Sequence, residues 1–307
     1  MRLKHQAPTR LAAFGAGKAF GFYEQAARRL KKAEFVAIID PYRGPNIDNH
    51  CAVAARLQDL ENLAVEAVLI TSPNCYHAEQ VIEATTAGLN VLCEKPLGIT
   101  VEQAERAIAV ARANNKWLQV AMHCRYRPEI RYLSQHIDGP IVFFEQHYEE
   151  NWISASPWYF EPKMSGGGVL LDVGINQIDW LLPFLDLLSA KKATCETGGY
   201  RVDVECKIEW TWRGGTGVTH LSWCAAEEKK LTRILTKAGT CFELDHRNHA
   251  ITRDGRSILL QECREYEGVL ADFLLNMNGY RTMDVRAVEV LKLLRSAYNL
   301  AGLKFLQ

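Results

Sequence analysis

The sequence contains no apolar run near the length of about 18 residues that a membrane-spanning helix requires. Its first segment, residues 1–17, also lacks the long apolar core of a secretion signal, so we expect a cytoplasmic protein with no membrane partner. Net charge is absent as well, because 36 lysines and arginines balance 36 aspartates and glutamates. A neutral chain does not favour nucleic acid or an anionic membrane surface, and we expect neither as a partner.

Cysteine is scattered, and its nine positions include no C-x-x-C pair. We therefore expect no metal site of the structural zinc type, and we expect reduced thiols among apolar core residues, as in cytosolic proteins. Internal repeats and low-complexity segments are absent too. The remaining composition is 48% hydrophobic and 23% charged over 307 residues, which suits two globular domains or one large one.

The first third of the chain has the pattern of a dinucleotide-binding unit. Residues 10–14 predict a buried strand, residues 22–32 a helix, and residues 34–40 a second strand that ends in an acid. Between the first strand and the helix, Gly15 permits a tight turn and Gly17 lets the backbone approach a pyrophosphate. This order of strand, glycine turn, helix and strand predicts a Rossmann domain.

The start of that helix supplies the expected phosphate contacts. A helix N-terminus offers N–H groups and a positive dipole end, so Lys18 and Ala19 are expected beside the phosphates. The sequence departs from G-x-G-x-x-G at the third position, where Phe20 stands and Gly21 follows one residue late.

Asp40 indicates which dinucleotide is bound. It lies about 25 residues after Gly15, in the zone of the acid that binds the ribose hydroxyls. A carboxylate there repels the 2′-phosphate of NADP, so we expect NAD as the cofactor. Arg43 could still reach a phosphate, which leaves NADP open, although a solvated loop charge is the favoured explanation of Arg43.

A second strand and its loop add cofactor-side candidates. Residues 65–71 form a continuous apolar run typical of a parallel strand. Ligands bind such sheets at the carboxyl ends of the strands, so Ser72, Pro73, Asn74 and His77 are expected on the cofactor side.

The triplet Glu94-Lys95-Pro96 follows the next short strand, residues 90–93. Pro96 disfavours the helical region for Lys95, which is therefore expected to be extended at the strand end. We place Glu94 and Lys95 beside the cofactor, and Lys95 also in a proton-handling role. The alternative is a surface lysine that precedes a helix at residues 101–114.

A glycine-rich segment, residues 165–181, carries the strongest candidates for substrate contact. Three glycines, Gly166 to Gly168, allow positive φ or a close approach to a ligand. Beyond them Asp172, Asn176 and Asp179 have the i, i+4, i+7 spacing of one helical face, which could hold neighbouring hydroxyls of a polar substrate. The alternative is an ordinary helix start with Asp172 near its cap.

The fold expected from these patterns is α/β plus α+β. Residues 1–125 form a Rossmann domain whose last strand spans 117–122, and residues 126–307 form a domain with an open, mostly antiparallel sheet. That open face predicts a homodimer or homotetramer. Strands of the second domain are expected at 141–148, 193–197, 202–212, 216–224, 231–236 and 241–244, with closing helices at 266–278 and 285–299.

Several motifs together resemble the glucose–fructose oxidoreductase, inositol dehydrogenase and rhizopine-catabolism (Gfo/Idh/MocA) superfamily. They are the G-x-G turn, the strand-end Asp, SPNCYHAEQV, CEKPLG, MHCRYRP and GGGVLLDVGIN, in this order. Many members have His four residues after the Asp, whereas this chain has Asn176, an amide that cannot accept a proton as imidazole does. That departure weakens a resemblance to the inositol dehydrogenases.

Further segments resemble the bacterial L-arabinose and D-galactose 1-dehydrogenases of the same superfamily. The matching segments are His123-Cys-Arg125, Tyr148-Glu149-Glu150, Trp158-Tyr-Phe-Glu161-Pro162, Asp172-Val-Gly174-Ile175-Asn176 and Arg264-Glu265-Tyr266. The resemblance implies NAD(P)-dependent oxidation of a cyclic aldose at C1 to its lactone, and it does not identify the sugar. Another oxidoreductase of the superfamily, acting on a keto-sugar, imine or inositol-type substrate, and a non-catalytic dinucleotide-binding sensor are the alternatives.

In the mechanism that this implies, Asp172, Lys95 and Asn176 are the catalytic candidates. Asp172 or Lys95 removes the hydroxyl proton, and Asn176 fixes the sugar through hydrogen bonds. The sequence does not separate the two candidate bases. His123 and Glu149 are further candidates for sugar hydroxyls, and Trp152 and Trp158 for stacking on the sugar, with structural roles as the alternative for each of these four.

Overall fold

The computed structural model describes residues 7–40, 51–153, 155–262, 264–277 and 285–304. The chain divides into two compact units, each made of separate segments. The first unit comprises Met1–Gly98, Glu102–Ala121 and Tyr266–Val285, and the second comprises Ile99–Val101, Met122–Glu265 and Arg286–Gln307. None of the helices within the described ranges has both the length and the apolar character needed to cross a lipid bilayer.

A six-stranded parallel sheet forms the centre of the first unit. Its order is β3-β2-β1-β4-β5-β6, so the strand order reverses between β1 and β4. The strands are β1 (Thr9–Phe14), β2 (Ala33–Ile39), β3 (Ala52–Ala54), β4 (Ala67–Ile70), β5 (Asn90–Glu94) and β6 (Leu118–Ala121). Strand β4 is buried along its whole length, as expected for a strand covered on both faces. The predicted Rossmann sheet is confirmed.

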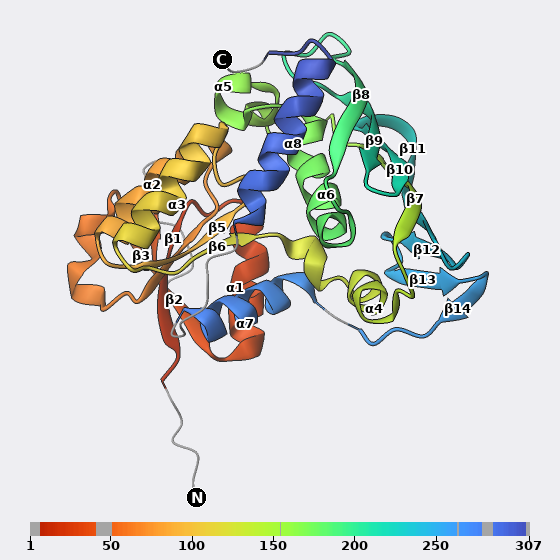
Figure 1. Cartoon of the computed structure of the whole chain (residues 1–307). Helices are drawn as coiled ribbons and strands as arrows, with labels where there is room; N and C mark the ends of the chain where they lie inside the picture. Colours follow the sequence, from red (N-terminus) through yellow and green to blue (C-terminus); the bar gives the residue numbers. More distant parts are fainter. Residues whose placement is uncertain (1–6, 41–50, 154, 263, 278–284, 305–307) are drawn as a thin grey trace, which may run out of the picture. The chain divides into compact units, whose positions relative to one another are not determined.

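Helices cover both faces of this sheet. They are α1 (Lys18–Leu30), α2 (Asn74–Thr86), α3 (Val101–Ala113) and α7 (Glu265–Asn276), with a short 3₁₀ helix at Leu57–Leu63. Crossovers between parallel strands are right-handed. From β1 the chain adds β2 and β3 toward one edge of the sheet, and β4, β5 and β6 toward the other edge. Helix α1 therefore lies on one face of the sheet, and α2 and α3 lie on the other (Figure 1). This is the doubly wound arrangement, with its ligand-binding point where the order reverses.

Helix α7 returns to the first unit from late in the sequence. Tyr266 stacks on Phe22 with ring centroids 4.7 Å apart and meets Tyr23 edge-on at 5.1 Å. Glu267 also forms an ion pair with Arg29 of α1 at 3.1 Å. Helix α7 therefore packs beside α1 (Figure 1). The expected helix at 266–278 is present, but the expected division at 125/126 did not include its return to the first unit.

The second unit contains an eight-stranded sheet of order β14-β13-β12-β11-β7-β10-β9-β8. Its one parallel pair among the described strands is β7 with β10, and the other pairs are antiparallel. The strands are β7 (Ile141–Asn151), β8 (Ser189–Glu196), β9 (Glu205–Trp212), β10 (Gly215–Ser222), β11 (Cys224–Thr236), β12 (Cys241–Asp245), β13 (Ala250–Arg253) and β14 (Arg256–Ile258). The mostly antiparallel sheet is confirmed, and β13 and β14 extend it beyond the expected strands.

One face of this second sheet is buried. Along β7 and β9 the residues alternate between buried and accessible, as a strand with one covered face requires. Phe144 and Trp212 stack on the covered face with centroids 5.3 Å apart. Gln146 on the same face donates to the Gln177 carbonyl at 3.4 Å, which places the helical segment carrying Gln177 against it.

The helices of the second unit follow one another between these strands. They are α4 (Pro128–His136), α5 (Pro162–Ser165), a π-helical turn (Leu170–Gly174), α6 (Ile175–Leu181) and α8 (Arg286–Leu300), with 3₁₀ turns at His123–Tyr126, Pro157–Phe160 and Leu182–Phe184. Helix α8 packs beside β8 and α6 (Figure 1).

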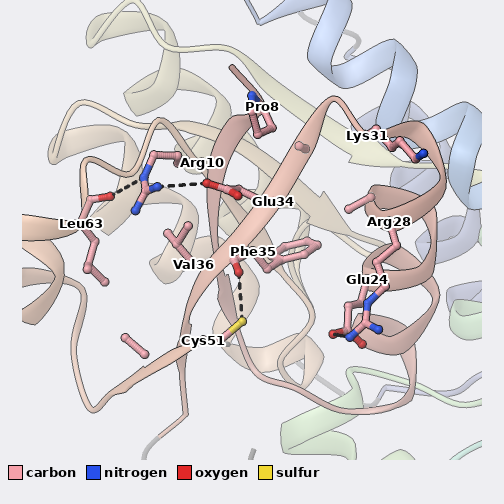
Figure 2. A pocket seen from close by; sticks show the side chains of 13 residues that line it. Pro8, Arg10, Glu24, Arg28, Lys31, Glu34, Phe35, Val36, Cys51 and Leu63 are labelled. Atoms are coloured by element: carbon pink, nitrogen blue, oxygen red, sulfur yellow. Dashed lines mark hydrogen bonds and ion pairs between the residues drawn. The ribbon is translucent and has the colours of Figure 1, made fainter. Parts of the chain in front are cut away.

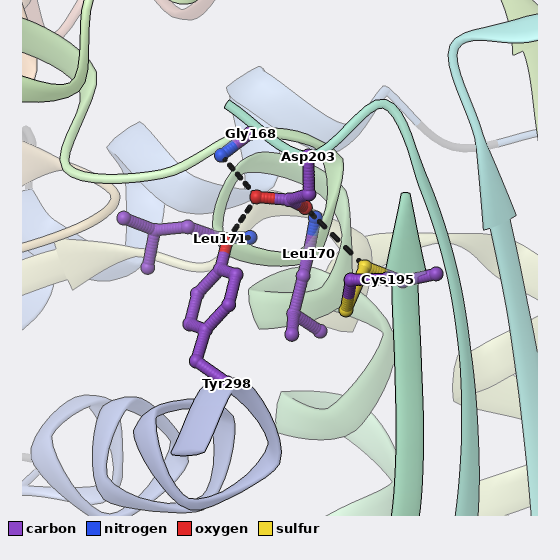
Figure 3. The surroundings of a disulfide bond; sticks show 7 residues. Gly168, Leu170, Leu171, Cys195, Asp203 and Tyr298 are labelled. Carbon is purple, nitrogen blue, oxygen red and sulfur yellow. Dashed lines mark hydrogen bonds between the residues drawn. A yellow bond between two sulfur atoms is a disulfide. The ribbon is translucent and has the colours of Figure 1, made fainter. Parts of the chain in front are cut away.

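A disulfide joins Cys195 of β8 to Cys206 of β9, which are directly opposite in the antiparallel register (Figure 3). The expectation of reduced thiols is therefore wrong for this pair. The sequence spacing gave no sign of it, because the two cysteines meet only when β8 and β9 pair. The other cysteines of the described residues are unbridged.

Candidate active site

The glycine turn of the first unit has the shape that phosphate binding requires. Gly15 has φ +77°, and a Cβ there would lie 3.0 Å from the backbone of Ser72, so only glycine fits. A Cβ on Gly17 would meet no atom within 4 Å, so open space lies in front of the α1 N-terminus. Gly17 has no side chain to cap α1, and the first turn contains no acid, so the dipole end is not neutralised there. These features fit a dinucleotide pyrophosphate.

The departure from the glycine motif has a structural reason. Phe20 is buried and packs edge-on against Phe35 of β2, with ring centroids 5.0 Å apart. The aromatic ring thus mediates the helix–strand contact that a third glycine would otherwise allow. Lys18 is exposed and Ala19 half-buried at the start of α1. Their contact with phosphates stays a prediction.

Asp40 directly follows β2, where its amide donates to the Ala54 carbonyl at 3.2 Å. Its side chain is half-buried at the carboxyl end of the strand, the position expected for a ribose contact. Arg43 lies outside the described residues, so its proposed phosphate contact is not tested.

The loop after β4 is tied to the glycine turn. Thr71 donates from Oγ1 to the Gly15 carbonyl at 2.9 Å, which holds the two strand ends together. Ser72 donates to Gln80 at 2.6 Å, and Pro73 is the N-cap of α2, followed by the buried Asn74. Sequence analysis did not single out Thr71, although it is a hydroxyl at the carboxyl end of a predicted strand.

His77 connects two backbone segments rather than facing an open space. It is buried, with Nδ1 2.6 Å from the Pro96 carbonyl and Nε2 2.8 Å from the Ser72 carbonyl. Burial lowers the pKa of His77, while the two carbonyl contacts oppose that effect. Both ring nitrogens are therefore occupied by protein, and His77 positions the loop that contains Lys95.

Glu94 has a similar positioning role at the end of β5. It is buried, accepts a hydrogen bond from Tyr23 Oη at 2.9 Å and another from the Lys95 amide at 3.2 Å. Burial and the neighbouring Glu94 carboxylate raise the pKa of Tyr23 well above its ordinary value, so the phenol stays a hydrogen-bond donor. Lys95 itself is half-buried, and the peptide bond between Lys95 and Pro96 is cis.

The first unit also contains a cavity of about 750 Å³, which Figure 2 shows from close by. Arg10 lines this cavity, donates to the Leu63 carbonyl at 2.9 Å and forms an ion pair with Glu34 at 3.0 Å. This cavity lies by the early residues of β1 and β2, whereas Gly15 and Gly17 follow the end of β1. It is therefore not the dinucleotide site.

In the second unit, the three consecutive glycines make room for protein rather than for a ligand. A Cβ would lie 2.7 Å from Ile99 at Gly166, 2.5 Å from Tyr298 Oη at Gly167, and 1.8 Å from the Asp203 carbonyl at Gly168. Of the two alternatives expected for this loop, positive φ is confirmed at Gly166, at +83°. The close approaches of its glycines are to protein rather than to a ligand. Only residues without a side chain allow the loop to pack so closely.

Asp203 fixes this loop through hydrogen bonds to its backbone. Its buried carboxylate accepts hydrogen bonds at 2.8 Å each from the Gly168 amide, the Leu170 amide and Tyr298 Oη (Figure 3). Burial raises the pKa of Asp203, and these hydrogen bonds oppose the rise. The Cys206 sulfur lies 3.4 Å from the same carboxylate. Asp203 thus fixes the start of the segment that carries Asp172 and Asn176.

That segment begins as a π-helical turn, Leu170–Gly174, before α6 continues as a regular helix. The expectation of one regular helical face through Asp172, Asn176 and Asp179 is therefore wrong at its first member, because a π-turn contains an extra residue. π-helical turns within helices are frequent at functional sites. Asp172 is half-buried inside this turn.

Asn176 and Asp179 differ sharply in their surroundings. Asp179 is fully buried and binds Arg125 through both carboxylate oxygens, at 2.6 and 2.5 Å, so its acceptors are used. Asn176 is only 6% exposed, and its Oδ1 has no hydrogen-bond partner among the described residues. A buried unsatisfied acceptor costs free energy unless a ligand or an ordered water satisfies it. Asn176 is therefore the best-supported substrate contact of the predicted set.

His123 is held as a cation by Glu265. Its Nδ1 bonds one carboxylate oxygen of Glu265, whose other oxygen accepts from Arg127 Nε at 3.0 Å. Burial alone would lower the pKa of His123, but the adjacent Cys124 sulfur and the Glu265 carboxylate raise it to about 10. Burial would raise the pKa of Glu265, but His123 and Arg127 lower it to about 2. His123 can donate a hydrogen bond at neutral pH, but it cannot act as a general base.

Glu149 points away from α6. It accepts from His147 Nδ1 at 2.5 Å, and these two residues share the face of β7 opposite to that of Gln146, which contacts the helical segment. The contact of Glu149 with a sugar hydroxyl stays a prediction. Tyr148 and Lys230 occupy the face of Gln146 instead, with Lys230 Nζ 4.9 Å from the Tyr148 ring centre.

The two tryptophans proposed for stacking lie in the segment after β7. The Trp152 amide donates to the Trp223 carbonyl at 2.8 Å. Trp158 stacks on Tyr159 with centroids 3.9 Å apart, and Tyr159 in turn meets the buried Trp223 edge-on at 6.2 Å. Trp158 thus belongs to an aromatic cluster, whereas Trp152 is joined to Trp223 through the backbone, and the contact of either tryptophan with substrate stays a prediction.

Comparison with known proteins agrees with this geometry. The sequence profile described as "Oxidoreductase family, NAD-binding Rossmann fold" matches residues 9–122, and the profile of the Gfo/Idh/MocA C-terminal domain matches residues 131–242. The rhizopine catabolism protein MocA of Rhizobium meliloti is 29% identical over 184 residues, which cover 56% of each chain. Levoglucosan dehydrogenase of Pseudarthrobacter phenanthrenivorans is 31% identical over 142 residues, 43% of this chain and 36% of that enzyme. The matched part thus spans about half or less of these relatives.

Solved structures show the same fold over nearly the whole chain. D-galactose-1-dehydrogenase from Rhizobium etli superposes with a TM-score of 0.85 at 19% identity, covering 97% of both chains. A levoglucosan dehydrogenase in complex with NADH superposes with a TM-score of 0.82 at 18% identity, covering 96% and 97%. Two family domains in the expected order, on the expected fold, establish the relationship: the chain belongs to the Gfo/Idh/MocA family of oxidoreductases with an NAD-binding Rossmann fold.

Proposed function

We propose that this protein is an NAD-dependent sugar oxidoreductase that oxidises a cyclic aldose, of the L-arabinose or D-galactose type, at C1 to the lactone. Relatives named as sugar dehydrogenases support the general class. The observation that carries the choice of a polyhydroxylated substrate is Asn176, whose buried Oδ1 lacks a partner among the described residues. A sugar hydroxyl is a donor that satisfies such an acceptor.

NAD is the cofactor that the first unit fits best. The open space before Gly17 and the uncapped α1 N-terminus suit the pyrophosphate, and the strand-end Asp40 suits a free ribose diol. NADP is the alternative, because relatives named for that cofactor occur among the matches. When bound, the nicotinamide accepts the hydride, and the protein supplies binding, orientation and proton handling.

The protein's own residues then have separate roles. Asn176 accepts a hydrogen bond from a sugar hydroxyl and orients the ring. His123, kept protonated by Glu265, donates to a second oxygen. Asp172 and Lys95 are the candidates for accepting the hydroxyl proton, and each is tested by its own variant. Glu94 and His77 keep the Lys95 loop in place through their buried hydrogen bonds.

The direct test is the absorbance of reduced nicotinamide with purified protein, NAD or NADP, and a panel of free aldoses, inositols and hydroxy acids. Reduction of NAD with an aldose, and formation of the lactone, would support the proposal. Activity only with keto-sugars and NADH in the reverse direction would support another oxidoreductase of the family. Binding of NADH without turnover of any substrate would support a dinucleotide-binding sensor.

The Lys95→Ala variant tests the proton-handling role. We expect kcat to fall at least 100-fold, in line with the usual contribution of general acid–base groups, while NADH affinity changes little. Fluorescence titration of NADH measures the affinity, and Lys18→Ala, at the exposed start of α1, serves as the control that changes binding rather than kcat. An unchanged kcat in Lys95→Ala would remove Lys95 from the mechanism.

A further inference from the structure

A group of side chains that can bind a metal lies on the face of the β7–β10 pair that is turned away from α6. Glu145, His147 and Glu149 alternate with the buried Phe144 and Gln146 along β7 and therefore share the accessible face. His220 of β10 stands directly beside His147 in the parallel register. One atom from each of Glu145, His147 and His220 lies within 4.8 Å of the others.

His147 is already oriented as a metal ligand would be. Its Nδ1 lies 2.5 Å from a Glu149 oxygen, and its Nε2 lies 3.1 Å from a Glu145 oxygen. Metal-binding histidines usually donate their second ring N–H to a carboxylate, which fixes the tautomer and leaves the other nitrogen for the metal. Glu149 supplies that carboxylate, so Nε2 is the nitrogen left for coordination.

The spacing at Nε2 suits a tetrahedral ion. Zinc bonds of about 2.0–2.1 Å place neighbouring ligand atoms about 3.3 Å apart, close to the 3.1 Å between His147 Nε2 and Glu145 Oε1. The His220 ring lies parallel to that of His147, at 5° and 4.5 Å, so it must turn about its Cβ–Cγ bond to direct a nitrogen at the same point. That torsion is broad for histidine, so the turn is inexpensive.

The electrostatics also favour a divalent cation. Two carboxylates and two imidazoles carry a net negative charge when both imidazoles are neutral. Three exposed cations pair with these residues across the sheet: Lys207 is opposite His220, Lys229 is opposite Glu149, and Arg233 is opposite Glu145. Because they are exposed to solvent, they compete only weakly with a metal ion.

We propose that Glu145, His147 and His220 form a binding site for a divalent cation of the zinc class, with Glu149 as the carboxylate that orients His147. Three protein ligands leave a fourth position for a water molecule or for a ligand from outside the chain. The expectation of no metal site rested on cysteine spacing, which does not bear on a site made of histidine and glutamate. The sequence sign is E-x-H-x-E on one strand with a histidine on a neighbouring strand, and only the β7–β10 pairing joins the two.

Isothermal titration of EDTA-treated, dialysed protein with ZnCl₂ measures the site directly. We expect one zinc ion per chain, and binding at least tenfold weaker in His220→Ala and in Glu145→Gln. Binding should also weaken as the pH falls from 7.5 to 6, because imidazole binds a metal only in its neutral form. Cobalt substitution should give the visible absorption of a tetrahedral site in the parent and lose it in His220→Ala.

His136→Ala is the matched control, because His136 is an exposed histidine of α4 outside this group. Its zinc affinity should equal that of the parent. His123→Ala tests the other group of His, Cys and Glu side chains, His123, Cys124 and Glu265, and should also leave zinc binding unchanged. Zinc affinity unaffected by His220→Ala, or absence of zinc binding in the parent, would overturn the proposal. Circular dichroism confirms that each variant is folded, and His220→Gln replaces His220→Ala if that variant is not.

Discussion

We expect Asp40, at the end of β2, to set the cofactor preference through its carboxylate. We expect Asp40→Ala to lose the hydrogen bonds to a ribose diol and the repulsion of a 2′-phosphate, so that NADH affinity falls several-fold and NADPH affinity does not. Fluorescence titration with each reduced nucleotide gives the ratio. Asp59→Ala, an acid exposed on the 3₁₀ helix of the same unit, is the control. An unaltered NADH:NADPH ratio would show that Asp40 does not face the ribose.

His123 and Glu265 form one ionic unit whose pH dependence follows from the two shifted pKa values. The pKa of His123 is raised, so the stability it contributes is complete below about pH 6.5 and is lost as the pH rises through about 10. The pKa of Glu265 is lowered, so its contribution is complete above about pH 4.3 and is lost as the pH falls toward about 2. The pair therefore stabilises the fold most between about pH 4.3 and pH 6.5.

Glu265→Gln removes one of the charges that keep His123 protonated. Because burial and the Cys124 sulfur still act on the ring, we expect the pKa of His123 to fall from about 10 toward neutrality, and kcat/KM to gain a new dependence on pH there. NMR titration of the histidine Cε1–H signals measures the pKa, with His123→Ala for assignment and the exposed His136 as the internal control. A His123 midpoint that stays above pH 8 would contradict the role given to Glu265.

Among the structural elements, the segment from Gly166 to α6 is fixed by a single buried carboxylate. In Asp203→Asn the amide group offers one acceptor where two oxygens now accept from Gly168, Leu170 and Tyr298. We expect a loss of about 1–3 kcal/mol in the free energy of unfolding, because at least one buried N–H loses its partner. Urea unfolding measures this loss.

The same variant separates positioning from stability. Because Asp203 fixes the start of the segment carrying Asp172 and Asn176, we expect kcat to fall while NADH affinity is retained. Tyr298→Phe removes one of the three donors and also the hydroxyl that accepts from the Leu171 amide at 3.2 Å. Because it leaves the Asp203 carboxylate and its two amide donors in place, we expect a smaller fall in both stability and kcat. Unfolding free energy within 0.5 kcal/mol of the parent in Asp203→Asn would contradict the contribution assigned to the carboxylate.

The elements that sequence predicts well are those whose signal is local. Strand β1, the turn at Gly15 and Gly17, and strand β2 follow from apolar runs and glycine spacing within about 30 residues, and the structure has all of them. Strand β7 was also placed correctly. Near the end of β7, however, polar residues lie on both faces of the strand. The sequence pattern therefore could not show that Tyr148, rather than Glu149, lies on the strand face that contacts α6.

What the sequence could not supply depends on residues far along the chain. The close packing of Gly168 needs Asp203, 35 residues later, and the fixed charge of His123 needs Glu265, 142 residues later. The π-helical turn around Asp172 has no propensity signal of its own, because the same residues suit an ordinary helix. Local patterns therefore identified the candidate segments. Tertiary contacts decided which side chains in those segments are already bound to other protein groups.

At the scale of the whole molecule, the proposed homodimer or homotetramer depends on the accessible face of the second sheet. Phe143 on β7 and Leu231 and Leu235 on β11 are 36%, 42% and 38% exposed, and Leu235 is paired with Phe143 in the register. Large apolar side chains gathered on one sheet face are typical of an interface between copies of a chain. A second copy of this chain is therefore the expected occupant.

The Leu231→Glu variant tests that assembly. A carboxylate buried against the apolar face of a second copy is unfavourable, so we expect the oligomer to dissociate to monomers with little change in the fold of either unit. Size-exclusion chromatography with light scattering gives the mass, and circular dichroism gives the secondary structure. Leu259→Glu is the matched control, because Leu259 is 99% exposed and lies outside the strands. An oligomer that survives Leu231→Glu, or a parent that is already monomeric, would show that this face is not the interface, and the exposed leucines would then need another explanation.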